Sequence, residues 1–216
     1  MDHQLPAQPA PGRTHDPEGV RRNILAIATA EFAEKGFSGA RVDEIAAKIN
    51  TSKRMIYYYF KDKEGLFVAV LEEAYARIRR IERDLNLDGL SPVDALARLT
   101  GFTFEYQSEN ADFVRLVMVE NIHHAVHLAR SERMQSLNVS VLQVLEDVYR
   151  RGVAEGVFRD GIDVVDIHMT MSALSFFNVS NRATFSAIFK RDMVSPEAFT
   201  RRRQVVVETV LRYVAR

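Results

Sequence analysis

The 216-residue sequence contains no cysteine. Disulfide bonds and thiol redox chemistry are therefore excluded, and the expected location is a reducing cytoplasm. The chain also lacks a net charge, because 29 Lys and Arg residues balance 29 Asp and Glu residues. The overall charge consequently says nothing about a nucleic-acid partner, and only the local distribution of charge can indicate one.

Long hydrophobic runs are missing as well. The longest stretch without Asp, Glu, Lys or Arg covers residues 167–181, which is too short and too polar to span a bilayer. The first 16 residues hold no apolar segment of the kind that a signal peptide needs. No segment shows a sustained alternation of β-branched and polar residues, so we predict no β-strands.

Proline is scarce outside the N-terminus. Four of the six prolines lie in the first 17 residues, so residues 1–16 are expected to form a disordered arm. Pro92 and Pro196 each follow a serine. A serine hydroxyl caps a helix and the next proline presets the backbone angle, so Ser91 and Ser195 are each predicted to begin a helix.

Apolar residues recur at spacings of three and four, which predicts an all-α fold of about nine helices. Gly36 is expected to end the first of them. A further short helix could lie within residues 178–192. The nine predicted helices cover residues 17–35, 42–49, 52–59, a stretch from Lys63 onward, 91–107, two segments between 111 and 152, 163–179 and 195–216.

The second and third predicted helices are only about two turns long, so they must pack on neighbouring helices to be stable. Between them lie Asn50, which tolerates the left-handed conformation, and Thr51. Ser52 can then cap the next helix through its hydroxyl. A short helix, a tight turn and a second short helix form a helix-turn-helix unit.

The third helix has two different faces. Ile56 and Phe60 lie four residues apart and are predicted to pack inward. The opposite face carries cations, hydroxyl groups and aromatic rings, which suit phosphates and base edges in the major groove. Residues 35–63 hold seven basic and three acidic side chains, a net charge of plus four. The alternative is a solvated helix with aromatic core anchors, but three consecutive tyrosines cannot all face one core.

Residues 21–67 closely resemble the DNA-binding region of the tetracycline-repressor (TetR) family. The shared features are Ala-x-x-x-Phe-x-x-x-Gly-Phe from Ala28 to Phe37, Val-x-x-Ile-Ala from Val42, and the Tyr-x-Tyr-Phe-x-x-Lys-x-x-Leu pattern from Tyr57. Two positions depart from the family pattern. Asn50 stands where Gly is usual, and Arg41 stands where a Thr usually meets a phosphate.

The resemblance implies a homodimer with the third helix in the major groove, with Tyr57 and Lys63 near phosphates, and with repression relieved by a ligand. Residues 17–62 would form the DNA-binding domain and residues 63–216 a helical domain for ligand binding and dimerisation. The expected operator is near-palindromic, with Arg54 and Tyr58 as candidates for base contact. The candidate DNA-contact residues are Arg41, Val42, Thr51, Ser52, Lys53, Arg54, Tyr57, Tyr58 and Lys63.

The C-terminal domain holds aromatic, Met and polar residues in a mixture that suits a small organic effector. Ordinary helix-bundle core is the alternative interpretation for each of them. His123 and His127 lie four residues apart, but the sequence offers no further ligands beside them, so no metal and no cofactor are expected. The candidate effector-binding residues are Phe104, Met118, His127, Met171 and Asn178.

The helices at 163–179 and 195–216 are strongly apolar, which favours them as the dimer interface. An enzyme is disfavoured, because no phosphate-binding Gly-rich loop, Gly-x-Ser-x-Gly or His-Glu-x-x-His motif is present. A helical interaction module without an effector is the other alternative. A module that had lost DNA binding would carry neutral or acidic residues on the third helix, whereas Lys53, Arg54, Tyr57 and Tyr58 are all present. A transcriptional activator of the same fold remains an alternative to a repressor.

Overall fold

In a computed structural model, the described part of the chain is residues 16–216, without the side chains at positions 135 and 138–140. This part is helical throughout and contains no strand beyond an isolated bridge between Phe158 and Ala215. The predicted all-α class is therefore confirmed. The helices are α1 (Pro17–Gly39), α2 (Val42–Lys48), α3 (Lys53–Phe60), α4 (Lys63–Arg83), α5 (Pro92–Glu109), α6 (Ala111–Ile122), the 3₁₀ turn η1 (Leu128–Arg130), α7 (Glu132–Ala154), α8 (Val164–Ser180), α9 (Arg182–Phe189) and α10 (Pro196–Val214).

Side-chain caps begin most of these helices, as the sequence predicts. The hydroxyl oxygens of Ser52, Ser91 and Ser195 accept hydrogen bonds from backbone N–H groups in the first turns of α3, α5 and α10. The Asp163 carboxylate does the same for α8. Each such cap stabilises its helix by about 1 kcal/mol. The predicted disordered arm lies outside the described residues, apart from Asp16, which caps α1.

Two glycines shape the helices in different ways. Gly36 has a φ of 70°, so the regular part of α1 ends there, and a short turn continues to Gly39. The predicted helical segment that was to end by Gly152 continues as α7 to Ala154. A Cβ at position 152 would lie 2.0 Å from the Phe158 ring, so this glycine serves the close approach of that ring rather than a turn.

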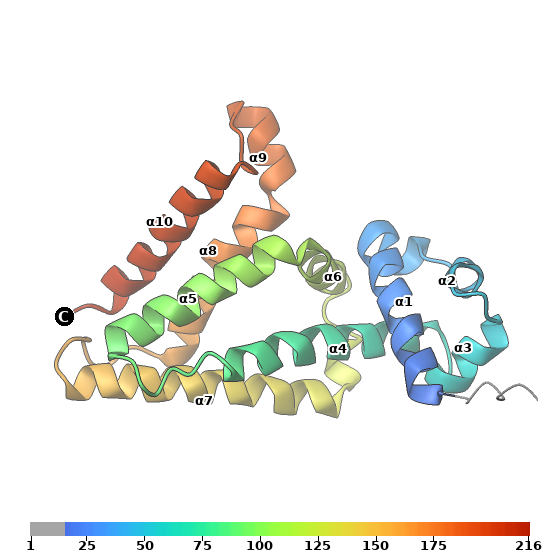
Figure 1. Ribbon diagram of the computed structural model, residues 1–216, viewed down its shortest axis with the longest axis horizontal. Coiled ribbons are helices and arrows are strands. Elements are labelled where there is room, and N and C mark those ends of the chain that lie inside the picture. Colours follow the sequence, from blue (N-terminus) through green and yellow to red (C-terminus); the bar gives the residue numbers. More distant parts are fainter. Residues whose placement is uncertain (1–15) are drawn as a thin grey trace, which may run out of the picture.

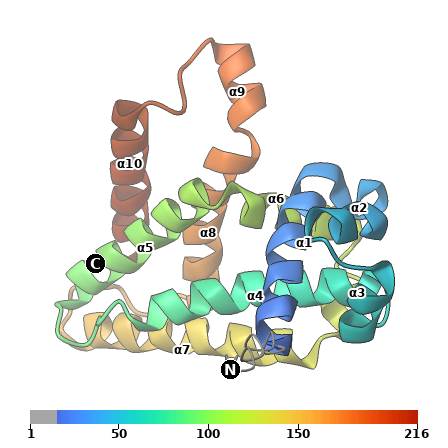
Figure 2. The same ribbon diagram turned by 45° about the vertical axis from the view of Figure 1, so that its right-hand side comes forward.

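The helices form two cores that α4 connects (Figures 1 and 2). The first core joins α1, α2, α3 and the beginning of α4, and Leu116 of α6 reaches into it. The second core joins α5, α7, α8 and α10. Both views show α4 running beside α7, with α1, α2 and α3 gathered at one end and α9 at the tip of an arm between α8 and α10.

Candidate nucleic-acid interface

A tight turn holds α2 and α3 in a helix-turn-helix arrangement. Asn50 adopts the left-handed conformation with a φ of 51°. The Thr51 N–H donates to the Ala46 carbonyl at 3.0 Å, and the Ser52 hydroxyl accepts from the Met55 N–H at 3.2 Å. The predicted motif is therefore present, and Asn50 takes the backbone conformation that the family's usual glycine would take.

The inward face of α3 is apolar and the outward face is not. Ile56 and Phe60 are buried in the first core. Lys53, Arg54 and Tyr58 are exposed on the other side. The polar and aromatic side chains on this face are therefore accessible to the major groove of a DNA duplex.

The three consecutive tyrosines separate as the helix geometry requires. Tyr58 is 79% exposed, whereas Tyr57 and Tyr59 are half-buried and pack against the first core. The Lys53 ammonium lies 5.7 Å from the centre of the Tyr57 ring, within the range of a cation–π contact. Of the three tyrosines, Tyr58 is thus the one whose ring does not pack in the first core.

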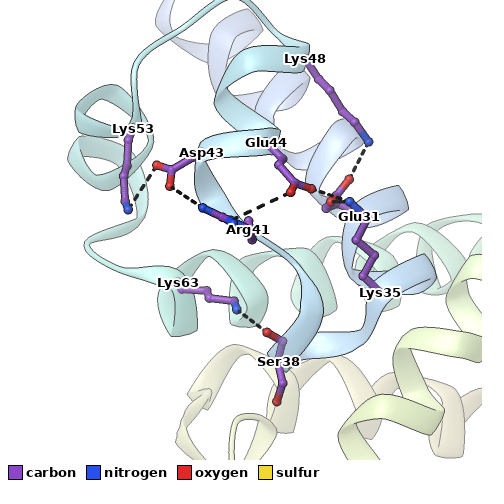
Figure 3. A network of polar contacts seen from close by, with 9 residues as sticks. All are labelled: Glu31, Lys35, Ser38, Arg41, Asp43, Glu44, Lys48, Lys53 and Lys63. Carbon is purple, nitrogen blue, oxygen red and sulfur yellow. Dashed lines mark hydrogen bonds and ion pairs between the residues drawn. The ribbon is translucent and has the colours of Figure 1, made fainter.

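Ion pairs link α3 to α2 at the surface (Figure 3). The Lys53 ammonium lies 3.2 Å from Asp43, and the hydrogen bond between them raises the pKa of Lys53. The Arg41 guanidinium lies 3.9 Å from Asp43 and 4.0 Å from Glu44. Such exposed pairs contribute roughly 0–1 kcal/mol each, so both cations can exchange these partners for phosphates at little cost.

A buried carboxylate fastens α1 to α2 behind this surface. Glu31 is fully buried, and its carboxylate lies 2.5 Å from the Lys35 ammonium and 2.6 Å from the Lys48 ammonium (Figure 3). Hydrogen bonds from Lys35 and then Lys48 lower the pKa of Glu31 to about 2. Lys35 and Lys48 are exposed, but their ammonium groups are paired with this carboxylate and so are less free to bind phosphates than Lys53 or Arg54. Sequence reasoning missed Glu31, although its i, i+4 spacing to Lys35 was a signal.

Lys63 is half-buried and Val42 is buried. The Lys63 ammonium donates to the Ser38 carbonyl at 3.4 Å and lies 5.0 Å from the centre of the Phe37 ring. Burial lowers the pKa of Lys63. The Val42 side chain is buried in the first core, so Val42 can offer DNA only its main chain.

The predicted effector residues do not all lie together. Phe104 and Met171 are fully buried, on helices α5 and α8 that pack together. Asn178 is buried farther along α8 and lines a pocket of about 210 Å³ between α8 and α10. Met118 on α6 is 36% exposed. The structure therefore brings Phe104 and Met171 into one region and leaves Met118 at the surface.

His127 lies at the junction with the DNA-binding helices. Its ring packs 4.7 Å from that of Phe37 and 5.0 Å from that of Phe67, measured between ring centres. Its Nδ1 lies 2.7 Å from the Glu120 carboxylate, which also accepts the backbone N–H groups of His127 and Leu128. His127 thus lies away from Phe104 and Met171 and holds the end of α6 against the first core.

Two features of the described residues bear on metal sites and on membrane insertion. No group of three His, Cys, Asp or Glu residues there is arranged to hold a metal ion. None of the helices in this part is both long enough and apolar enough to cross a membrane.

Sequence models of two protein families match this chain. The model described as "Bacterial regulatory proteins, tetR family" matches residues 24–70, the region of the helix-turn-helix. The model described as "Tetracyclin repressor-like, C-terminal domain" matches residues 92–210. The two matches cover both cores.

Individual proteins agree with the family models. The HTH-type transcriptional repressor NicS of Pseudomonas putida is 34% identical over 186 residues, which cover 86% of this chain and 88% of NicS. The putative transcriptional regulator SCO4942 of Streptomyces coelicolor superposes with a TM-score of 0.66 at 26% identity, over 90% of this chain and 97% of that one. FadR of Bacillus subtilis, solved in complex with stearoyl-CoA, shares the fold with a TM-score of 0.63 at 19% identity, over 88% and 97% of the two chains. The protein belongs to the TetR family of bacterial transcriptional regulators.

Proposed function

We propose that this chain is a homodimeric transcriptional repressor of the cytoplasm that binds a near-palindromic operator and leaves it when a small organic effector binds. One observation carries the DNA-binding part of the proposal. The face of α3 opposite Ile56 and Phe60 is exposed and carries Lys53, Arg54 and Tyr58. In this proposal residues 17–62 read DNA, and residues 63–216 bind the effector and dimerise.

The contact residues divide into two classes. Arg54 and Tyr58 are exposed on α3 and are proposed to contact bases, because a guanidinium group can bind a guanine edge through two hydrogen bonds. A second group of residues in and around the helix-turn-helix is proposed to contact phosphates, which position the protein without reading sequence. This second group comprises Arg41, Ser52, Tyr57 and Lys63, with Val42, Thr51 and Lys53 beside them.

The proposed dimer interface consists of α8 and α10. Four residues on one face of α8 are exposed at intervals of four, and three of them are large and apolar: Val165, Met169 and Phe177. On α10, Val207 and Leu211 line a largely apolar groove of about 610 Å³. Two helices from each protomer can cover these surfaces as a four-helix bundle.

The repressor assignment draws on the names of the relatives, since NicS is a transcriptional repressor. The bound stearoyl-CoA in FadR supports a small-molecule effector for a C-terminal domain of this fold.

Selection of binding sites from a random DNA library, followed by fluorescence anisotropy, tests the proposal. We expect a near-palindromic site whose half-sites are about 34–36 Å apart, the spacing of successive major grooves. We expect a Kd of about 10⁻⁸–10⁻¹¹ M at physiological salt. A scrambled site of the same length and composition is the control. Equal affinity for the selected and the scrambled sites at that salt concentration would refute sequence-specific binding.

A further inference from the structure

A row of polar side chains, all buried except the half-buried His168, lies in the C-terminal domain where α5 packs on α4 and on α8. Its members on α5 are three and four residues apart and its two members on α8 are seven apart, so on each helix they share one face. The two faces meet, because the Thr103 hydroxyl lies 3.8 Å from the Met171 sulfur. We call the following residues the polar seam: Arg79, Glu82, Thr100, Thr103, Gln107, His168 and Ser175.

Several atoms of the polar seam have no hydrogen-bond partner. They are Arg79 Nε, Thr100 Oγ1, Gln107 Oε1 and His168 Nδ1, and all four are shielded from solvent. Thr103 and Ser175 differ from Thr100, because their hydroxyls donate to the carbonyls of Leu99 and Met171 on their own helices. A buried polar atom without a partner is costly and uncommon in native proteins, so four on three packed helices require an explanation.

Arg79 gives the polar seam a guanidinium group with a free donor for an anion. Arg79 Nη1 donates to the Glu82 carboxylate, while Nε, which belongs to the side-on edge that binds carboxylates, is unpartnered. Burial raises the pKa of Glu82, and the charge and hydrogen bond of Arg79 oppose this shift. Burial and the nearby Arg79 charge lower the pKa of His168 to about 4, so His168 is uncharged at neutral pH.

We propose that the polar seam is the effector site and that it takes a small organic carboxylic acid carrying a hydrogen-bond donor. The carboxylate of this acid accepts from Arg79 Nε and Thr100 Oγ1. Its donor group is received by Gln107 Oε1 or His168 Nδ1. This assignment rests on the proposed function, because it supplies the effector of the proposed repressor. Buried water molecules are the ordinary alternative partners of such atoms, so the experiment must separate an acid from water.

The experiment uses the full chain and pairs of probes of nearly the same size, in which a carboxylate is compared with its uncharged amide. Lactate is compared with lactamide, and 3- and 4-hydroxybenzoate are compared with the corresponding hydroxybenzamides, by calorimetry and thermal melting. We expect at least one acid to bind and to weaken operator affinity by roughly 5- to 150-fold, the usual range of allosteric coupling. The uncharged amide of that acid should have no effect at the same concentration.

Variants then locate the site. Thr100→Val and Gln107→Leu remove two unpartnered atoms with little change in volume, so the melting temperature should stay the same or rise while the response to the acid is lost. Arg79→Met should also abolish the response. Arg80→Met is its matched control, because Arg80 lies on the exposed face of α4. If Arg79→Met does not fold, the responses of Thr100→Val and Gln107→Leu to the acid still show whether it binds at the polar seam.

Two results would overturn the assignment. One is that no acid of the panel binds the protein or weakens operator affinity more strongly than its amide. The other is an acid response that persists in both Thr100→Val and Gln107→Leu, which would place the effector elsewhere. A failure of the proposed function looks different, because the unliganded wild-type protein would then bind no specific operator at all.

Discussion

At the scale of single residues, the DNA-binding surface contains side chains in two different settings. Arg54 projects from α3 into solvent, and no ion pair with it was found among the described residues. Lys63 lies beside the Ser38 carbonyl and the Phe37 ring at the edge of the first core. The first setting suits a base contact, and the second suits a fixed contact to the phosphate backbone.

Arg54→Ala and Lys63→Ala should therefore fail in different ways. Arg54→Ala is expected to cost about 1–3 kcal/mol of binding energy and to relax the preference at one base position. Lys63→Ala should weaken binding to all sequences alike and reduce the salt slope by about 1. Anisotropy titrations against single-base operator variants at several salt concentrations measure both effects. A uniform loss for Arg54→Ala would move Arg54 to the phosphate-contacting class.

Glu31→Gln should destabilise the protein by about 1–3 kcal/mol at neutral pH, because it removes the charge that pairs with Lys35 and that strengthens the hydrogen bond from Lys48. The pKa of Glu31 is about 2 in the folded protein against an ordinary value of 4.5. Its carboxylate therefore stabilises the fold above pH 4.5, and this contribution is lost as the pH falls from 4.5 towards 2.

Urea denaturation at pH 7 and at several values between 4.5 and 2 measures the effect of Glu31→Gln. The stability difference between wild type and variant should shrink as the pH falls through this range. Glu34→Gln, at an exposed position of α1, is the matched control and should change little. A difference that stays constant down to pH 2 would contradict the role assigned to Glu31.

At the scale of elements, α8 and α10 each have one face in the second core and another face that nothing in the monomer covers. Ile167 and Met171 of α8 are buried, whereas Val165 and Met169 are 51% and 60% exposed. We propose that this apolar stripe belongs to the dimer interface, because contiguous exposed apolar surface commonly marks an interaction site.

Met169→Asp and Val207→Asp should consequently weaken dimerisation, because each would bury an unpaired charge in the proposed interface. Sedimentation velocity over a range of protein concentrations should show dissociation at a concentration where the wild type is dimeric. Val126→Asp makes a similar change at an exposed apolar position near the 3₁₀ turn η1 and should leave the dimer intact. A wild type that is monomeric at micromolar concentration would refute the interface.

At the scale of the whole molecule, two helices connect the DNA-binding end to the rest. Leu66, Phe67 and Leu71 place the beginning of α4 in the first core, while Arg79 and Glu82 farther along α4 belong to the polar seam. The end of α6 is held to the first core by His127 and its contact with Glu120. Movement in the C-terminal domain can thus reach α3 through packed elements.

His127→Ala should reduce this coupling more than it reduces DNA binding. The substitution removes a buried ring between Phe37 and Phe67 and is expected to cost about 1–3 kcal/mol of stability. Operator affinity without effector should change little, whereas release of the operator by the effector should be weakened. Ile122→Ala, a truncation at a 71% exposed position of α6, is the control. Equal release by wild type and His127→Ala would show that this contact does not transmit the signal.

The features that could be predicted from the sequence depend on neighbours within a few positions. The caps at Ser52, Ser91 and Ser195, the turn at Asn50 and the exposure of one tyrosine among three follow from helix geometry and local hydrogen bonding. Those local rules were enough to identify the helix-turn-helix and its outward face. They also led to the all-α class, because no alternating pattern was present.

Only the tertiary structure decided which distant side chains meet. Glu31 fastens α1 to Lys48 of α2, and His127 packs against Phe37 and Phe67 rather than beside Met171. Periodicity predicts the face on which a side chain lies, but not which of several helices covers that face. The covering helix depends on crossing angles and on the fit of the whole set of side chains. For the same reason, the sequence alone could not show that atoms of the polar seam on α4, α5 and α8 lack hydrogen-bond partners.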